Sequence, residues 1–347
     1  MARMKYLMPL VALSLLTLAI ACNRDNEEEN YPSLRIDLSD AKSLKDNAKG
    51  IDGLRLNDSL ASHFPGFITK IDWLKDTIVI LDTWKDPGAY LYNSSGQQIK
   101  SYNDRGSGPA DFLSLSDMNV VNGKLYLLDG VKDGKLIELN SNLEFVGCKP
   151  GEYQAQHFAT SRDGSEKWFD RGNIGYDDNK DKLVYSKDTH RKGVLAIPSD
   201  IENVTFSSYN VFAAAEGDTI LYLPPLEAKI YQCSGGKAEV LCTLDFNGKW
   251  PVFTENSDKS NPLGMMKDVH DKGQIYNANI FCDKSTVLIA FYSSDDLYLY
   301  LFDYRDLTPK GFFKVDKESL AGLGNIIGFR HGQLIFGEPG KLLYITI

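Results

Sequence analysis

A short apolar strand pattern recurs six times along the 347-residue chain, and this repeat limits the fold more than any other feature. Each copy follows a turn and consists mainly of apolar and β-branched residues, as in Thr77–Asp82 and Lys124–Asp129. The copies begin at residues 77, 124, 167, 219, 286 and 333, the third being the weakest. Such intervals are close to the period of propeller blades. The repeat therefore predicts six blades.

Each copy belongs to a longer unit with the pattern of a four-stranded antiparallel meander. In the first unit, four apolar runs are separated by short breaks that supply turn geometry. The runs are Phe67–Lys75, Thr77–Asp82, Ala89–Asn93 and Gln97–Tyr102. A single meander cannot bury both of its faces, so it needs neighbours of the same kind. We therefore expect an all-β fold, a six-bladed β-propeller of four-stranded antiparallel blades.

The last unit lacks a fourth strand before the final residue, Ile347. An unpaired strand edge invites aggregation, and closing the ring of blades removes such edges. Leu34–Leu38, near the other end of the chain, alternates apolar and charged residues as a strand does. We predict that this N-terminal strand completes the last blade.

The first residues have the pattern of a targeting segment. Arg3 and Lys5 precede an apolar run, Tyr6–Ala21, that is short for a membrane span and typical of a signal peptide. Leu18–Cys22 resembles the lipobox of bacterial lipoproteins, with its Leu one place earlier than usual. The resemblance implies a signal peptide over residues 1–21 and lipid attachment at Cys22. An ordinary cleaved signal and an uncleaved anchor are the alternatives.

Residues 22–30 are polar and acidic, and Asn23–Asn30 contains no apolar residue. This composition favours a flexible tether between the lipid and the propeller, which would occupy residues 31–347. The tract also resembles those that follow the lipidated cysteine in surface-exposed lipoproteins of the Bacteroidetes. This resemblance implies an outer-membrane lipoprotein displayed on the cell surface, with the periplasmic face of the membrane as the alternative.

Acidic residues outnumber basic ones in the chain that remains after signal cleavage. Without Arg3 and Lys5, 36 basic residues stand against 47 acidic ones, a net charge of −11. Such a chain repels phosphate backbones, which argues against nucleic acid as a partner.

Four cysteines follow Cys22, all within expected strands: Cys148, Cys233, Cys242 and Cys282. Cys233 and Cys242 lie in consecutive strands. If Cys233 pairs opposite Ala238, however, Cys242 lies two hydrogen-bonded residue pairs further along the two strands. The Cα atoms of Cys233 and Cys242 are then too far apart for a disulfide. We expect buried free thiols.

The octet Arg105–Phe112 ends the first unit and contains a Gly-x-Gly. Phosphate binding would require a helix N-terminus after it, and strand residues follow instead, so we expect a tight connection between blades. The octet resembles the Gly-x-Gly-Pro-Gly-Glu-Phe/Tyr signature of six-bladed β-propeller lipoproteins of the Bacteroidetes (TolB-like or NHL-like propellers), with Ala110-Asp111 replacing Gly-Glu. Pro150–Tyr153 echoes its second half, and Leu244–Pro251 is similar to the family's Asp-Phe-Gly-Lys stretch. The resemblance implies fold and location, because these motifs are structural.

No motif for catalysis or for a cofactor is present in the sequence. There is no Gly-x-Ser-x-Gly, and no carboxylate pair stands out among the 47 acidic residues. The histidines show no paired metal-binding spacing; they are His63, His157, His190, His270 and His331. Because a propeller can gather ligands from separate blades, the sequence leaves metal binding open. We predict no catalytic residue and no cofactor.

Four side chains are predicted to form a binding rim. Strand direction alternates, so loops between second and third strands share a face with the connections between blades. That rule gathers Trp84, Arg105, Arg171 and Trp250 on one face of the propeller. Trp and Arg are frequent in binding surfaces because they combine large contact area with directional hydrogen bonds. The alternative is that Trp84 and Trp250 pack between blades.

These observations favour a membrane-anchored lipoprotein whose propeller is a non-catalytic binding or interaction module. Its ligand would be a glycan, a peptide or a protein. The alternative is a propeller enzyme, such as a lyase, lactonase or glycosidase, with its site at the central channel.

Overall fold

The structure is a computed structural model that describes residues 31–57, 63–130, 134–149, 154–174, 180–204, 208–253, 257 and 259–347. The predicted signal peptide, Cys22, the whole acidic tether and Pro150–Tyr153 lie outside the described residues.

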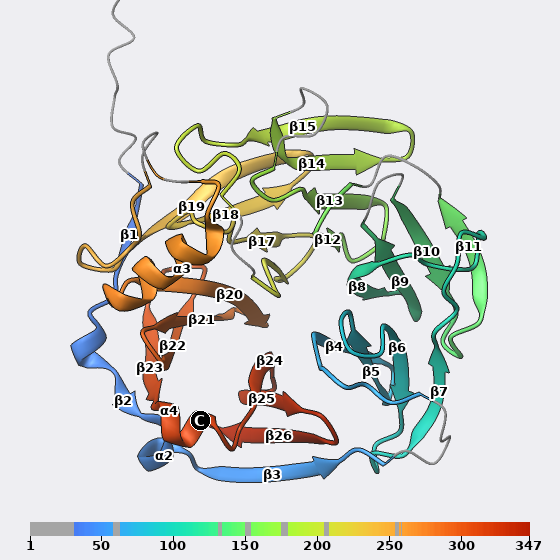
Figure 1. The fold of residues 1–347 in the computed structure, drawn as a ribbon, viewed down its shortest axis with the longest axis horizontal. Helices are drawn as coiled ribbons and strands as arrows, with labels where there is room; N and C mark the ends of the chain where they lie inside the picture. Colours follow the sequence, from blue (N-terminus) through green and yellow to red (C-terminus); the bar gives the residue numbers. More distant parts are fainter. Residues whose placement is uncertain are drawn as a thin grey trace, which may run out of the picture. The chain divides into compact units, whose positions relative to one another are not determined.

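Three blades follow directly from the repeat (Figure 1). Blade 1 contains β4 (Lys70–Leu74), β5 (Thr77–Asp82), β6 (Gly88–Tyr92) and β7 (Gln98–Tyr102). Blade 2 contains β8 (Leu115–Val121), β9 (Lys124–Asp129), β10 (Lys135–Leu139) and β11 (Phe145–Lys149). Blade 3 contains β12 (His157–Thr160), β13 (Glu166–Asp170), β14 (Asp181–Lys187) and β15 (His190–Ala196).

The other three blades each include a strand from the N-terminal region. Blade 4 contains β16 (Phe212–Ala214), β17 (Ile220–Tyr222), β18 (Lys229–Ser234), β19 (Lys237–Asp245) and β1 (Ser33–Arg35). Blade 5 contains β20 (Ile275–Asp283), β21 (Thr286–Ser293), β22 (Asp296–Asp303), β23 (Pro309–Val315) and β2 (Lys42–Ser43). Blade 6 contains β24 (Asn325–Arg330), β25 (Gln333–Glu338), β26 (Lys341–Thr346) and β3 (Gly50–Arg55).

The predicted six-bladed propeller is therefore confirmed. The innermost strands β4, β8, β12, β16, β20 and β24 contact one another in a closed cycle around a central channel. Because strand direction alternates within each blade, the channel has two different faces. We call the connection face the one that carries the blade-to-blade links and the loops between second and third strands. The hairpin face carries the remaining turns.

An N-terminal strand completes the last blade, but it is not the predicted one. The closing strand is β3, which pairs antiparallel with β26 from Gly50 opposite Thr346 to Arg55 opposite Lys341. The predicted segment, Leu34–Leu38, instead contributes β1, which pairs parallel with β19 of blade 4. The residues of β3 are mostly exposed, so this strand does not need alternating apolar residues. Its sequence therefore lacks the pattern by which a strand is predicted.

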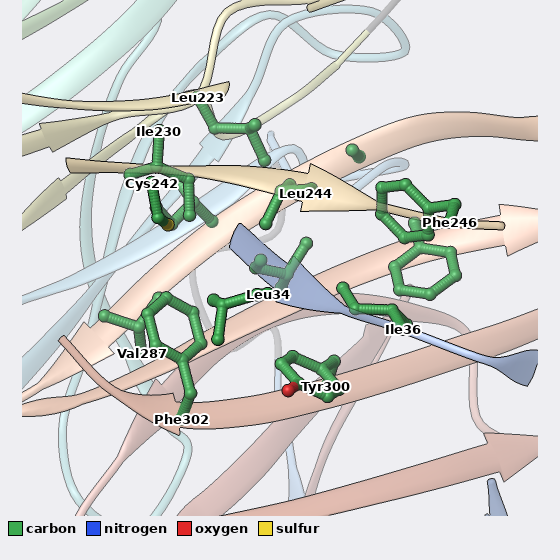
Figure 2. Packing of buried hydrophobic residues seen from close by; sticks show 14 of the residues in the cluster. Leu34, Ile36, Leu223, Ile230, Cys242, Leu244, Phe246, Val287, Tyr300 and Phe302 are labelled. Carbon is green, nitrogen blue, oxygen red and sulfur yellow. The ribbon is translucent and has the colours of Figure 1, made fainter. Parts of the chain in front are cut away.

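The segment Ser33–Ala48, which we call the strap, runs along the outer edges of blades 4 and 5. Leu34 and Ile36 insert between these two blades, where they meet Leu244 on one side and Tyr300 on the other (Figure 2). Leu44, at the start of α2 (Leu44–Asn47), inserts between blades 5 and 6. The strap therefore adds apolar side chains to two successive seams of the ring.

Other predicted features are also present. Arg105 forms a β-bridge with Phe112, so the glycine-rich octet is a tight connection between blades 1 and 2. Cys233 pairs opposite Ala238, the register that was assumed in excluding a disulfide. The four cysteines of the described chain are free thiols; Cys233 and Cys242 are buried as predicted, whereas Cys148 and Cys282 are only partly buried. The insertion before blade 5 contains α3 (Pro262–Asp271), and a short α4 (Lys317–Leu320) precedes blade 6. Within the described residues, no helix has the length and apolar character needed to cross a membrane.

Candidate functional site

Three aromatic side chains meet over the channel on the connection face. Phe67 precedes β4 of blade 1, and Tyr209 precedes β16 of blade 4; their ring centroids are 5.9 Å apart. Blades 1 and 4 lie opposite each other in the ring, so this contact spans the channel opening. Trp84, in the β5–β6 loop, packs edge-on against Phe67 at 5.8 Å. We call these three residues the aromatic bridge.

Buried polar groups fix the backbone that carries the aromatic bridge. Asp82, at the end of β5, accepts hydrogen bonds from the backbone N–H groups of Phe67 at 2.9 Å and Trp84 at 2.7 Å. Asn279 of blade 5 accepts the backbone N–H of Tyr209 at 2.9 Å. Trp84 is nevertheless 69% exposed and Tyr209 41% exposed. The result is a rigid aromatic surface that faces solvent.

The predicted rim residues occupy different environments. Trp84 and Arg105 are exposed, Trp84 within the aromatic bridge and Arg105 in the connection that follows β7. Arg171 is buried, and its backbone N–H donates to the carbonyl of Lys182 at 2.8 Å. Trp250 stacks on Phe246 at 5.3 Å, and its Nε1 donates to the Leu226 carbonyl at 3.3 Å. Arg171 is therefore buried in the β13–β14 loop, and Trp250 packs between blades 4 and 5, while Trp84 lies beside the channel.

The channel also contains a pocket of about 650 Å³, and this pocket opens on the hairpin face. Its walls are the inner strands of blades 1 to 4, and its mouth is formed by the β8–β9, β12–β13 and β16–β17 turns. The volume is typical of small-molecule sites. We call it the channel pocket.

Charged side chains from blade 1 enter the wall of the channel pocket. Lys70 Nζ lies 2.8 Å from Asp117 Oδ1 of blade 2, and both side chains are largely buried. Asp117 also accepts the backbone N–H of Phe158, in blade 3, at 2.9 Å. One carboxylate thus joins three consecutive blades.

Asp72 performs a similar link between blades 1 and 2. Its carboxylate accepts the backbone N–H of Val120 at 3.1 Å and that of Trp73 at 2.7 Å. Enclosure by the channel wall raises the pKa of Asp72, an effect that the Trp73 N–H and the charge of Lys70 oppose. Asp72 borders the pocket and is therefore an enclosed carboxyl group within reach of a bound molecule.

The remaining polar groups of the channel pocket come from blades 2 to 4. Asn119 Oδ1 accepts the Thr160 hydroxyl at 2.8 Å, so the amide nitrogen of Asn119 remains as a donor. At the mouth, Arg162 and Asp218 are exposed. Glu216 is paired with Arg305 at 3.0 Å.

The pocket residues were missed in the sequence, although a signal was present. Inner strands of a propeller are largely apolar, yet β4 contains Lys70 and Asp72 two residues apart, and β8 contains Asp117 and Asn119 in the same spacing. Side chains two residues apart share one face of a strand. Polar pairs of this kind in first strands indicate a polar channel wall. Phe67 and Tyr209 lie in connecting segments, and nothing in the sequence pattern relates them.

Metal donors do not gather in the part of the chain that the structure describes. No group of three or more His, Cys, Asp and Glu side chains there is arranged to hold an ion.

Comparisons with known proteins agree with the fold. A protein described as an exported protein of Bacteroides fragilis NCTC 9343 has a similar structure, with a TM-score of 0.71 and 15% identity over 92% of this chain and 99% of that one. A member of the DUF4221 family from Bacteroides vulgatus ATCC 8482 has a TM-score of 0.56 and 9% identity over 86% and 96% of the two chains. No curated protein matches the sequence significantly.

The family match covers most of the propeller. Residues 63–310 match a family described as a six-bladed β-propeller, DUF5128. They include all of blades 1 to 3, blade 4 without β1, and blade 5 without β2 and most of β23. The chain belongs to this DUF5128 family of six-bladed β-propellers.

Proposed function

We propose that this protein is an outer-membrane lipoprotein, attached through Cys22, whose propeller is a non-catalytic binding module for a macromolecular partner. The lipobox-like Leu18–Cys22 and the acidic tract after it support the anchor. The structurally similar Bacteroides fragilis protein is described as exported, which is consistent with a cell-envelope location. Surface display fits a module that meets partners outside the cell.

The observation that carries the binding role is the exposure of a fixed Trp84. Leaving a large aromatic side chain in water forgoes the free energy of burying it, about 1.5 to 3 kcal/mol for a large apolar side chain. Asp82 and Phe67 hold Trp84 in place, so a partner would lose little conformational entropy on binding it. Exposed Trp and Tyr on a rigid scaffold are frequent centres of binding surfaces. In this proposal Trp84 and Tyr209 contact the partner, Arg105 contributes at the periphery, and Arg171 and Trp250 hold the surrounding loops.

A binding screen tests this role directly. Purified protein would be applied to arrays of bacterial and host glycans, and of peptides, as wild type and as Trp84→Ala and Tyr209→Ala. We expect at least one class to bind the wild type and to be lost in both variants. Leu263→Ala, which removes an even more exposed apolar side chain from α3, is the control. Binding that is unaffected by Trp84→Ala and Tyr209→Ala would contradict the proposed surface.

The anchor has its own test. Cys22→Ala should leave an unprocessed or soluble product, because the lipid supplies the membrane affinity and an acidic domain adds little. Membrane fractionation and palmitate labelling of the two forms measure this. A Cys22→Ala protein that is still membrane-bound and labelled would rule out lipid attachment at this residue.

The enclosed Asp72 is the one observation that favours the alternative, a propeller enzyme such as a lyase, lactonase or glycosidase acting at the channel. A carboxyl group with a raised pKa keeps its proton to a higher pH than an ordinary aspartate and is therefore better suited to act as a proton donor. If this alternative holds, turnover of a lactone or glycoside substrate would be detectable in the wild type and abolished by Asp72→Asn. No turnover by the wild type would contradict the alternative, and turnover that Asp72→Asn leaves intact would exclude Asp72 as the proton donor.

A further inference from the structure

The channel pocket lies at the opposite end of the channel from the aromatic bridge and is a separate site. The rings of Phe67 and Tyr209 meet over the connection face, whereas the turns that line the pocket belong to the hairpin face. A molecule would therefore enter the pocket from the hairpin face. This site does not depend on whether the aromatic bridge binds a partner.

The lining of the channel pocket has nearly balanced charge. Two cations, Lys70 and Arg162, stand with three anions, Asp72, Glu216 and Asp218. Lys70 is already paired with Asp117, and Glu216 with Arg305. A ligand with a large net charge would find no matching excess of the opposite charge here. The lining therefore favours a ligand that is polar and uncharged overall.

The groups left for a ligand are both donors and acceptors. Asp72 supplies carboxylate lone pairs, and Asn119 supplies an amide donor because its oxygen already accepts the Thr160 hydroxyl. A hydroxyl group can donate to the first and accept from the second, so a molecule with several hydroxyls satisfies both. Val120, Ala214 and Ala215 also line the pocket and are not buried, so they add apolar surface between these polar groups, as is usual in small-molecule sites.

We propose that the channel pocket binds a small uncharged polyhydroxylated molecule, a mono- or disaccharide. Hydroxyl groups of this molecule bond to Asp72 and Asn119, and Arg162 and Asp218 lie near the open end of the pocket. The pocket of about 650 Å³ is within the range that encloses ligands of this size. The wall residues come from separate blades, so a bound sugar would also join blades that the strap does not reach.

Isothermal titration calorimetry tests the proposal with defined probes. Glucose, galactose, N-acetylglucosamine and trehalose represent neutral sugars, glycine and alanine represent zwitterions, and glucose 6-phosphate represents charged sugars. We expect at least one neutral sugar to bind more tightly than any zwitterion or phosphorylated sugar. Asn119→Ala should weaken that binding about tenfold, because a hydrogen bond worth about 1.4 kcal/mol is lost.

A blocking variant keeps the test valid if Asn119→Ala perturbs the fold. Ala214 is exposed at the end of β16 and lines the pocket, so Ala214→Trp should fill the pocket and abolish sugar binding. Ala196→Trp, at an exposed position on the outer strand of blade 3, is the matched control and should bind as the wild type does. Trp84→Ala should also leave sugar binding unchanged, which separates this site from the connection face.

Three results would overturn the proposal. The first is no neutral sugar binding to the wild type at millimolar concentrations. The second is binding that survives Ala214→Trp. The third is tighter binding of a zwitterion or of glucose 6-phosphate than of every neutral sugar.

Discussion

The seam between blades 4 and 5 and the seam between blades 2 and 3 are held together in different ways. In the described residues, the first contains a cluster of 18 buried apolar residues, including Leu34 and Ile36 of the strap. The second contains a cluster of only six, among them Phe158 and Phe169. Neighbouring blades of the same ring are therefore joined by unequal amounts of apolar contact.

Polar contacts supplement the thinner seam. Asp117 binds the backbone of Phe158 across it, Asn119 binds Thr160, and Asn122 Nδ2 donates to the Asp163 carbonyl at 3.1 Å. A buried group such as the Asp117 carboxylate is stabilising only while it remains fully paired. The apolar seam therefore tolerates local change, whereas the polar seam depends on single hydrogen-bond partners. The polar seam also borders the channel pocket, so stability and binding share residues there.

Removing the N-terminal strands should produce the largest effect and would test the role of the strap. A chain that begins at Lys49 loses the strap but keeps β3, and a chain that begins at His63 loses both. We expect the first to fold with a lowered melting temperature, because the apolar sides of two seams are exposed. The second should show no cooperative thermal transition by circular dichroism, because blade 6 is left open. Equal melting curves for the two chains would contradict the closing role of β3.

The polar seam can be broken by a single substitution. Asp117→Ala leaves the largely buried Lys70 unpaired and the Phe158 N–H without its acceptor, and should lower the free energy of unfolding by about 3 to 5 kcal/mol. Urea denaturation measures the loss. Adding Lys70→Met to Asp117→Ala should recover part of it, because the unpaired charge is then absent. No recovery in the double variant would show that the ion pair is not the source of the effect.

The apolar seam should respond less to a single truncation. Ile36→Ala removes a side chain that is 1% exposed between blades 4 and 5. We expect a loss near the lower end of the range of about 2 to 5 kcal/mol for such changes, because the strap can shift to fill the space. Ile51→Ala, in β3, removes a side chain that is 61% exposed and should change stability by less than about 0.5 kcal/mol. Similar losses for the two variants would mean that Ile36 is not buried in the seam.

The smallest effect concerns pH and the enclosed Asp72. Its pKa is raised in the folded chain above the ordinary value of 3.8, so the unfolded chain releases this proton first as pH rises. The contribution of Asp72 to stability therefore falls from about pH 4 up to the raised pKa and stays lowered at higher pH. Asp72→Asn removes this dependence. Its stability relative to the wild type should improve from pH 4 to pH 7, as measured by urea denaturation at each pH. A constant difference across that range would contradict the raised pKa.

Much of the fold could be predicted because the repeat is local. The starts of the second strands, predicted at residues 77, 124, 167, 219, 286 and 333, lie within one residue of those of β5, β9, β13, β17, β21 and β25. Apolar residues that alternate within a strand indicate which face of the strand is buried, and turn residues indicate where the strand ends. The number of blades and their order follow from that information alone.

Only the tertiary structure decided which strand closes the ring and what the channel contains. Leu34–Leu38 has the better strand pattern, yet β3 completes blade 6, because an outermost strand needs backbone partners and not an apolar face. Phe67 and Tyr209 are 142 positions apart and meet because opposite blades face one channel. The channel pocket likewise combines Asp72, Asn119 and Asp218 from separate blades. Strand patterns are set by neighbours along the chain, whereas these contacts are set by the closure of the ring.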